Sequence, residues 1–297
     1  MSARAFTKQV VRPVAGDLLS WGKDQLASLG PEESQAGAER LLAAVLGVER
    51  IRLYLGFEDE VSEEMAEDFR RLVAERKKRR PLAYLLGKVS FWNEVLEVDA
   101  GCLIPRPETE LLVERFVEES GFRKTDSFTF LDLGSGSGAI GIALLRCFPK
   151  ARATFSDVAP EALRTTEKNA ARYGLLDRVE IVGSNLFEKF RGTGRKWEAI
   201  LSNPPYLARA DWGTVEPEIM FEPRVALDGG KDGLDFYRRI TKEAPYYLVP
   251  GGRLAFEVGI HRSAKIRAEL LENRFNNIRI FKDYAGIERV ILAEMGS

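Results

Sequence analysis

The segment Thr129-Phe130-Leu131-Asp132-Leu133-Gly134-Ser135-Gly136-Ser137-Gly138-Ala139-Ile140-Gly141 decides the fold of this chain. The residues before the first glycine are mostly apolar, which predicts a buried strand. The glycines permit positive φ angles and let a ligand approach the backbone closely. Residues 142–147 then predict a helix, whose N-terminus presents free N–H groups to an anion. The segment therefore indicates a strand, a glycine turn and a helix that bind a ligand together.

An acidic residue follows at the distance expected of a nucleoside site. The next predicted strand, residues 151–156, ends in Asp157, about 23 residues beyond the first glycine of the loop. A carboxylate at this place can accept hydrogen bonds from both hydroxyls of a ribose. Gly136, Gly138 and Gly141 also satisfy the G-x-G-x-x-G dinucleotide pattern. That pattern is weak by itself and leaves an NAD-linked dehydrogenase open.

A second motif, Asn203-Pro204-Pro205-Tyr206, closes the largely apolar run 197–202 and therefore lies at the end of another predicted buried strand. Ligands of α/β sheets bind at such strand ends. The Asn203 oxygen and the Pro204 carbonyl offer two acceptors, which suit an NH2 group, and prolines restrict their direction. Tyr206 can stack on the flat face of that group. Taken alone, the tetrapeptide is equally well explained as a proline-rich turn.

The two motifs together favour methyl transfer from S-adenosylmethionine over hydride transfer. When two acceptors take hydrogen bonds from both N–H groups of a planar NH2, they favour a pyramidal nitrogen with an exposed lone pair. That lone pair can then attack a methyl group. We expect direct transfer, without a metal. The residues expected to bind the cofactor are Asp132, Gly134, Gly136, Gly138, Asp157 and Asn203. Those expected to hold the acceptor are Asn203, Pro204, Pro205 and Tyr206, with Asn203, Pro204 and Tyr206 catalytic.

Composition is that of a soluble globular protein. The 297 residues include 45% hydrophobic and 30% charged residues, enough for one substantial core and a smaller second domain. No apolar stretch has the length of a membrane span, and the N-terminus lacks the apolar region of a secretion signal. Cys102 and Cys147 lack the C-x-x-C spacing of metal or redox sites. We therefore expect a cytoplasmic protein with reduced cysteines.

The net charge of −1 gives no general attraction for nucleic acid, so we expect no stable nucleic-acid partner. The basic run 75–81 closes a predicted helix, where cations oppose the negative end of the helix dipole. A solvated helix end is the simpler interpretation of this run. Contact with an acidic or RNA-containing partner, including the ribosome, stays open.

The pattern along the chain predicts three parts: a helical domain (1–85), a β-hairpin linker (86–106) and an α/β domain (107–297). One helix ends at Gly47, and a second begins after Ser62 with an apolar stripe at Met65, Phe69, Leu72 and Val73. The linker strands are 89–92 and 95–98. In the third part, helices and strands alternate, which predicts a parallel doubly wound sheet whose last two strands form an antiparallel hairpin at the edge. The predicted strands are 128–133, 151–156, 179–182, 199–202, 253–258, 278–281 and 289–293.

Over nearly its whole length the chain resembles the bacterial release-factor glutamine methyltransferases. Besides the two motifs above, the resemblance is carried by Pro81-Leu82-Ala83-Tyr84-Leu85-Leu86-Gly87, by Leu103-Ile104-Pro105-Arg106-Pro107-Glu108-Thr109-Glu110 and by the segment 221–234. It implies a seven-stranded, Rossmann-like class I S-adenosylmethionine-dependent methyltransferase with a small N-terminal helical substrate-recognition domain. It also implies methylation of the glutamine side-chain nitrogen (N5) in the Gly-Gly-Gln motif of peptide chain release factors, which would be the partners.

Within the resemblance, Asn185 stands where the family more often has an acidic residue near the adenine, and we add it to the cofactor-binding residues. Asn93 stands where a glycine is commoner. Arg106 either positions a carboxylate or fixes its loop, and Glu257 is interpreted as an edge or hairpin residue. The alternative functions are a ribosomal-protein glutamine methyltransferase, a nucleic-acid exocyclic-amine methyltransferase and a module that binds the cofactor without catalysis.

Overall fold

The computed structural model describes residues 12–296, and the chain divides into two compact units, Met1–Leu86 and Gly87–Ser297. Each unit is built around its own buried apolar residues. Within the described residues, no helix combines the length and the apolar character needed to cross a membrane.

The first unit is a small helical bundle. It contains α1 (Ala15–Gln25), α2 (Pro31–Leu46), α3 (Arg52–Leu55), α4 (Glu63–Lys77) and α5 (Leu82–Leu86). Both predicted helix ends are confirmed: Gly47 ends α2 with a left-handed φ of 67°, and the Ser62 hydroxyl accepts the Met65 N–H, 3.3 Å away, at the start of α4. The apolar stripe of α4 is shifted, because Ala66, Phe69 and Val73 are buried and Met65 is exposed.

The second unit begins with a two-stranded hairpin, β1 (Lys88–Phe91) and β2 (Glu94–Glu97). Both strands begin and end one residue earlier than predicted, so the turn falls on Trp92 and Asn93. This register pairs Phe91 with Glu94 and buries Phe91 and Leu96, while Trp92 takes a φ of 56°. Asn93 stays in the turn, and the shift of one residue places Trp92 there in place of Glu94.

The core of the second unit is a seven-stranded sheet in the order β5-β4-β3-β6-β7-β9-β8. Its strands are β3 (Thr129–Leu133), β4 (Arg152–Asp157), β5 (Val179–Gly183), β6 (Trp197–Ser202), β7 (Leu248–Glu257), β8 (Phe275–Lys282) and β9 (Glu288–Met295). The seven predicted strands and the antiparallel hairpin are confirmed, with β8 as the edge and β9 lying antiparallel between β7 and β8. β7 starts at Leu248, five residues before the predicted strand 253–258, because Leu248 pairs with Trp197 across a register shift.

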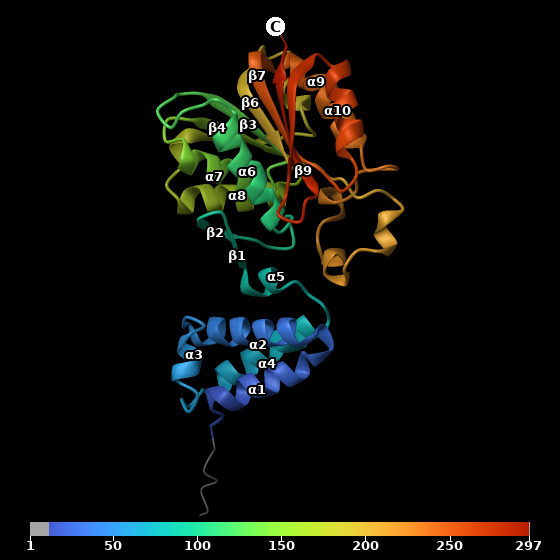
Figure 1. Ribbon diagram of the computed structural model, residues 1–297. Helices are drawn as coiled ribbons and strands as arrows, with labels where there is room; N and C mark the ends of the chain where they lie inside the picture. The colour runs from blue at the N-terminus through green and yellow to red at the C-terminus, as the bar shows by residue number, and fades with distance from the viewer. Residues whose placement is uncertain (1–11, 297) are drawn as a thin grey trace, which may run out of the picture. The chain divides into compact units, whose positions relative to one another are not determined.

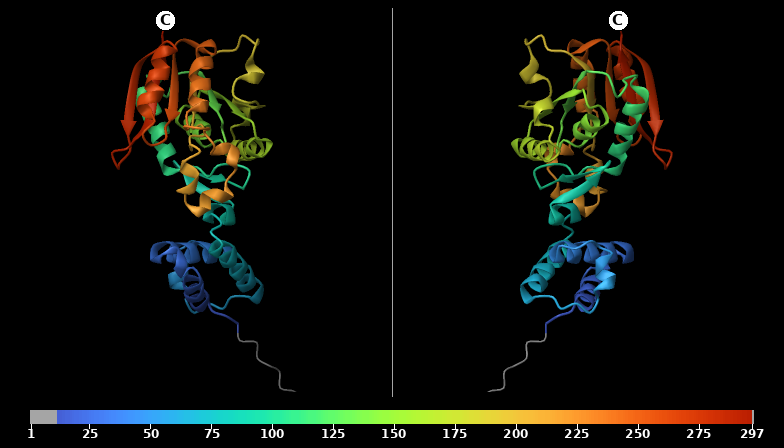
Figure 2. Two further views of the ribbon diagram at one scale, coloured as in Figure 1. Left: turned by 90° about the vertical axis from the view of Figure 1, so that its right-hand side faces the viewer. Right: turned by 90° about the vertical axis from the view of Figure 1, so that its left-hand side faces the viewer.

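Helices cover both faces of this sheet (Figures 1 and 2). On one face, α6 (Pro107–Glu119), α7 (Ala139–Cys147) and α8 (Pro160–Arg172) enclose one apolar cluster. On the other face, α9 (Asp235–Glu243) and α10 (Ser263–Glu272) enclose a second cluster. This three-layer arrangement buries both faces of the parallel strands, as their nearly continuous apolar sequences require.

The strand order reverses at β3. The chain runs from β3 through β4 to β5 on one side and then returns to β6 on the other side of β3. Ligands of doubly wound sheets bind outside the carboxyl ends of the strands at such a switch point. Here those ends are tied together, because the Ser202 hydroxyl of β6 donates to the Leu133 carbonyl of β3, 2.6 Å away. The glycine loop and Asn203 therefore begin next to each other.

Asp132 stabilises the glycine loop through a buried hydrogen bond to the helix that follows the loop. Its side chain is fully buried, and its Oδ2 accepts the Gly141 N–H in the first turn of α7, 2.9 Å away. Gly141 is needed there because a Cβ would lie 2.2 Å from Phe155 Cε1. Burial raises the pKa of Asp132 to about 7, the Gly141 N–H lowers it, and the Asp157 charge raises it further.

This burial predicts a pH dependence of stability. In the unfolded chain an aspartate titrates near ~3.9, so between about 4 and about 7 the folded state holds a proton that the unfolded state has lost. The Asp132 contribution to the free energy of unfolding therefore falls as pH rises through this range, by on the order of a few kcal/mol. Asp132→Asn should remove it, so that the variant gains stability relative to the wild type towards pH 7.

Urea unfolding of cofactor-free protein between pH 4.5 and pH 8 measures this difference. Asp177→Asn, which changes an exposed carboxylate of the same unit, is the matched control. A wild-type-minus-Asp132→Asn difference that stays constant with pH would contradict the burial argument.

Candidate active site

A cavity of about 320 Å³ lies at the switch point of the sheet. It brings together most of the residues that the sequence pointed to. Those that line it are Gly134, Gly136, Asp157, Asn185, Asn203, Pro204 and Pro205. Asp132, Gly138 and Tyr206 lie outside its lining.

The glycine loop and Asp157 form one side of the cavity. Gly134 and Gly136 have φ angles of 76° and 58°, and no atom lies within 4 Å of a Cβ built on either one. The backbone conformation, with open space for a ligand beside it, therefore explains these glycines. Asp157 accepts the N–H groups of Gly136 and Ala159, each 2.9 Å away, with one carboxylate oxygen apiece.

The two oxygens of Asp157 keep lone pairs for a ligand such as a ribose diol. Burial raises the pKa of this carboxyl, while its bonds from backbone N–H groups lower it. Gly138 supports the loop from outside the cavity. A Cβ on it would lie 3.1 Å from Thr166 Cγ2, and the Thr166 hydroxyl donates to the Gly136 carbonyl, 2.9 Å away.

The apolar walls come from segments that the sequence analysis did not assign to the site. Cys102 and Leu103 follow the hairpin, and Val158 follows Asp157. Leu186 and Phe236 also line the cavity. Such walls suit the faces of a planar ring. Of these residues, only Val158 had a sequence signal for a place in the site, because it is an apolar residue just beyond the end of a strand. In the structure its side chain is 54% exposed. Burial raises the pKa of the Cys102 thiol to about 11, so it stays protonated.

Asn185 reaches the cavity from the loop after β5, and both ends of its amide bind neighbouring side chains. Its Oδ1 accepts from Arg239 Nη2, 3.0 Å away, and its Nδ2 donates to Glu188 Oε1, 2.9 Å away. The amide oxygen retains one lone pair that an exocyclic amine could use. Arg239 thus fixes which end of Asn185 is the acceptor, a role that no local pattern indicated.

A smaller cavity of about 70 Å³ adjoins the first and contains Tyr206. Both cavities are lined by Leu103, Asn203, Pro204 and Ala226, so the two meet at the first residues of the Asn-Pro-Pro-Tyr motif. An acceptor group in the small cavity and a nucleoside in the large one would be in contact at this point. The arrangement therefore suits transfer of a group between two ligands.

Behind the motif lies a carboxylate that the sequence analysis misjudged. Glu257 is in β7, between β6 and β9, and is 1% exposed, so its interpretation as an edge or hairpin residue is wrong. The Thr109 hydroxyl donates to its Oε2, 2.5 Å away, and the Tyr206 hydroxyl lies 3.5 Å from its Oε1. Burial raises the pKa of Glu257 to about 7 and also raises the pKa of Tyr206. The sequence signal that could have indicated a buried carboxylate was a single acidic residue within an apolar strand.

Arg106 joins two of the segments that carry the family resemblance, 103–110 and 221–234. Its guanidinium pairs with Glu222, whose side chain is 2% exposed and whose Oε2 also accepts the Ile104 N–H, 3.1 Å away. Arg106 thus both meets a carboxylate and fixes its own loop. The small cavity is lined by Arg106 and by Ile219, which precedes Glu222 by three residues, so the ion pair lies beside this cavity.

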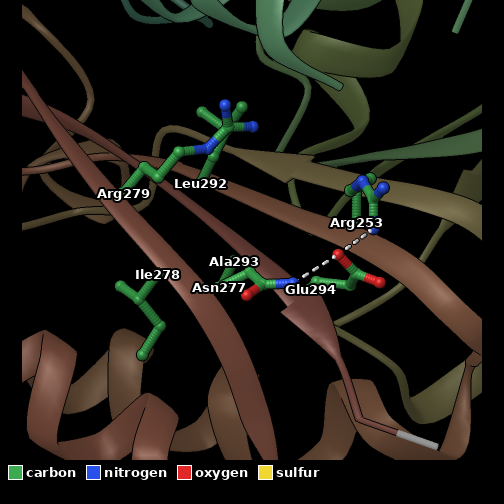
Figure 3. A pocket seen from close by; sticks show the side chains of 7 residues that line it. All are labelled: Arg253, Asn277, Ile278, Arg279, Leu292, Ala293 and Glu294. Atoms are coloured by element: carbon green, nitrogen blue, oxygen red, sulfur yellow. Dashed lines mark hydrogen bonds and ion pairs between the residues drawn. The ribbon is translucent and has the colours of Figure 1, made fainter. Parts of the chain in front are cut away.

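Another hollow, of about 420 Å³, lies on strands β7, β8 and β9 (Figure 3). Its polar side chains are satisfied by one another and by a neighbouring helix. Glu294 accepts from Arg253 at 2.9 Å and from Asn277 at 3.0 Å, while Arg279 pairs with Glu119. None of the predicted site residues lies here, so the switch-point crevice is the candidate active site.

Comparison with protein families agrees with this division of the chain. Residues 17–87 match the model of the PrmC N-terminal domain, and residues 107–231 match that of the methyltransferase small domain. Among solved structures, a methyltransferase from Pyrococcus furiosus covers 68% of this chain and 89% of its own, with 16% identity and a TM-score of 0.50. A 16S rRNA methyltransferase of T. thermophilus, solved with AdoMet and guanosine, gives a TM-score of 0.52 at 19% identity over 70% of this chain and 49% of its own. These two share the class I methyltransferase fold.

Curated relatives match over almost the full length. A release factor glutamine methyltransferase of Geobacter sulfurreducens is 38% identical over 94% of this chain and 96% of its own. One from Aquifex aeolicus is 37% identical over 89% of this chain and 92% of its own. The fold, the order of the motifs and these relatives lead to one conclusion: the chain belongs to the release factor glutamine methyltransferases, a family of S-adenosylmethionine-dependent enzymes.

Proposed function

We propose that this protein transfers a methyl group from S-adenosylmethionine to the side-chain amide nitrogen (N5) of the glutamine in the Gly-Gly-Gln motif of peptide chain release factors. The observation that carries the proposal is the meeting of the two cavities at Asn203 and Pro204. Family membership excludes the dehydrogenase interpretation of the glycine pattern. The names of the relatives favour release factors over ribosomal proteins or nucleic acid as substrates.

The large cavity, about 320 Å³, has a volume in the range of small-molecule sites and a lining that suits S-adenosylmethionine. The residues proposed to hold it are Asp132, Gly134, Gly136, Gly138, Asp157, Asn185 and Asn203. Asp157 would accept from the ribose hydroxyls, the exposed glycine backbone would lie along the ligand, and the apolar walls would enclose the adenine. Asp132 and Gly138 would act by supporting the loop. When bound, the cofactor supplies an electrophilic methyl group.

Asn203 and Pro204 would hold the acceptor. The Asn203 Oδ1 and the Pro204 carbonyl oxygen accept the two N–H groups of the glutamine amide, which stabilises a pyramidal nitrogen more than the planar ground state. Pro205 restricts the backbone, and Tyr206 flanks the amide. Alignment of this kind contributes on the order of 7–11 kcal/mol to lowering the barrier. The methylated nitrogen is strongly acidic and can release its proton to water.

The first unit would serve to recognise the partner protein. It has a separate core, and residues 17–87 match a domain model named for this protein family. Around α3 it exposes Ile51, Tyr54, Leu55 and Phe57, apolar side chains of the kind that protein interfaces cover. We propose the domain bounds that the sequence pattern predicts, a recognition domain at 1–85, a hairpin linker at 86–106 and a methyltransferase domain at 107–297; the first compact unit ends one residue later, at Leu86. A net charge of −1 supports a protein partner rather than a nucleic acid.

The cofactor assignment predicts that Asp157→Ala weakens binding of S-adenosylmethionine by about 1.5–3 kcal/mol, the value of hydrogen bonds to a charged group. Calorimetry measures it. Asp283→Ala is the matched control, because Asp283 also accepts two backbone N–H groups, at 2.9 Å each, but lies in the β8–β9 turn. Unchanged affinity in Asp157→Ala, or tight NADH binding by the wild type, would contradict the assignment.

The acceptor assignment predicts that Asn203→Ala lowers kcat by about 10²–10³, the cost of removing one preorganised polar contact, with little change in cofactor affinity. Transfer of labelled methyl to release factors, ribosomal proteins and RNA, tested side by side, measures the rate and the substrate class together. Asn277→Ala, in the hollow on β8, is the control. Near-normal turnover in Asn203→Ala would mean that the motif is only a turn.

The recognition role predicts that a protein lacking residues 1–86 still binds S-adenosylmethionine but no longer methylates an intact release factor. The remaining unit retains both apolar clusters around its sheet, so it should fold. Cofactor binding and cooperative thermal unfolding provide the folding control. Methylation of the intact factor at the full rate would show that recognition lies elsewhere.

A further inference from the structure

A buried chain of polar groups connects β7 to the acceptor motif. Asn203 Nδ2 lies 3.2 Å from Thr109 Oγ1, and Thr109 Oγ1 lies 2.5 Å from Glu257 Oε2. Thr109 is 4% exposed and Glu257 is 1% exposed. Neither lines the large or the small cavity, so neither is placed to touch cofactor or acceptor.

The hydrogen bonds between these polar groups run in one direction, because the groups differ in the hydrogens that they can donate. Glu257 is ionised above about pH 7, and its carboxylate then only accepts hydrogen bonds, whereas a threonine hydroxyl has one hydrogen to give. At 2.5 Å that hydrogen goes to Glu257, so Thr109 Oγ1 can only accept from its other neighbour. Asn203 must then turn its NH2 group to Thr109. Its Oδ1 is left for the small cavity, which Asn203 lines.

This direction matters because the two ends of an asparagine amide have nearly the same shape and opposite hydrogen-bonding roles. Turned by 180°, Asn203 would present a donor to the acceptor nitrogen and would repel its N–H groups. We propose that Glu257 and Thr109 are positioning residues that set which end of the Asn203 amide faces the methyl acceptor. The inference rests on the proposed function and adds to it a determinant in α6 and β7, outside the motif.

Other contacts hold Glu257 in place for this role. Its backbone carbonyl accepts from the Tyr237 hydroxyl, 2.8 Å away, and its Oε1 faces the Tyr206 hydroxyl at 3.5 Å. Oε2 is thereby left to Thr109. Tyr206 belongs to the same motif as Asn203, so one buried carboxylate meets both ends of the tetrapeptide, directly or through one hydroxyl.

The experiment compares variants of the full-length protein on an intact release factor at saturating cofactor and at pH 8, above the pKa of Glu257. Thr109→Val keeps the shape and removes the hydroxyl, so kcat should fall about tenfold to a hundredfold, as expected when a polar partner is lost. Affinity for S-adenosylmethionine should stay within about twofold of the wild type, and Thr109→Ser should restore kcat, because it keeps the hydroxyl. Thr241→Val is the matched control: a buried threonine of α9 whose hydroxyl binds the Arg238 carbonyl.

A double-mutant comparison separates positioning from a general loss of structure. If Thr109 acts only through Asn203, then Thr109→Val should cause no further loss in an Asn203→Ala background. Glu257→Met gives a second test that keeps the length of the side chain. It removes the acceptor of the Thr109 hydroxyl, which is then free to donate towards Asn203, so kcat should again fall while cofactor affinity holds.

Normal kcat in Thr109→Val or in Glu257→Met, with an active wild type, overturns this inference and leaves the proposed function standing. Additive losses in the double mutant also overturn it. A wild type that methylates no release factor overturns the proposed function and this inference with it. If Thr109→Val fails to fold, as shown by lost cofactor binding, Glu257→Met and Thr109→Ser decide the question.

Discussion

The active site depends on the parallel pairing of β3 with β6. The register places Asp132 beside Leu201, and the Ser202 hydroxyl closes the pair at its carboxyl end by donating to the Leu133 carbonyl. The next residue of β3 opens the glycine loop and the next residue of β6 is Asn203. A shift of one residue in either strand would turn the side chains to opposite faces of the sheet and separate the cofactor and acceptor cavities.

Buried acids are the second constraint on the site. Asp132, Asp157 and Glu257 lie at the carboxyl ends of β3, β4 and β7, and in each case burial is the main cause of a raised pKa. Each acid holds a neighbouring element: the first turn of α7, the glycine loop or the Thr109 hydroxyl. Keeping carboxyl groups in a poorly solvated place costs stability. The same groups give the site acceptors whose positions are fixed by their own hydrogen bonds.

Much of the fold could be predicted because its signals are local. The strand–glycine–helix segment, the Ser62 and Gly47 caps, and the alternation after residue 107 depend on neighbours within a few residues. The ends of strands were predicted less exactly. The hairpin turn lies one residue earlier than predicted, at Trp92 and Asn93, and β7 begins five residues earlier, at Leu248, which pairs with Trp197.

The sequence by itself determined which candidate site residues lie in short motifs: the glycine loop, Asp157 and the Asn-Pro-Pro-Tyr tetrapeptide. Only the tertiary structure decided which groups orient them. Thr109 meets Asn203 across 94 positions of the chain and Glu257 across 148, and Arg106 meets Glu222 across 116. Such contacts have no periodicity or spacing that can be read along the chain. They exist because the sheet order brings α6, β6 and β7 together, and sheet order is fixed by burial of both faces at once.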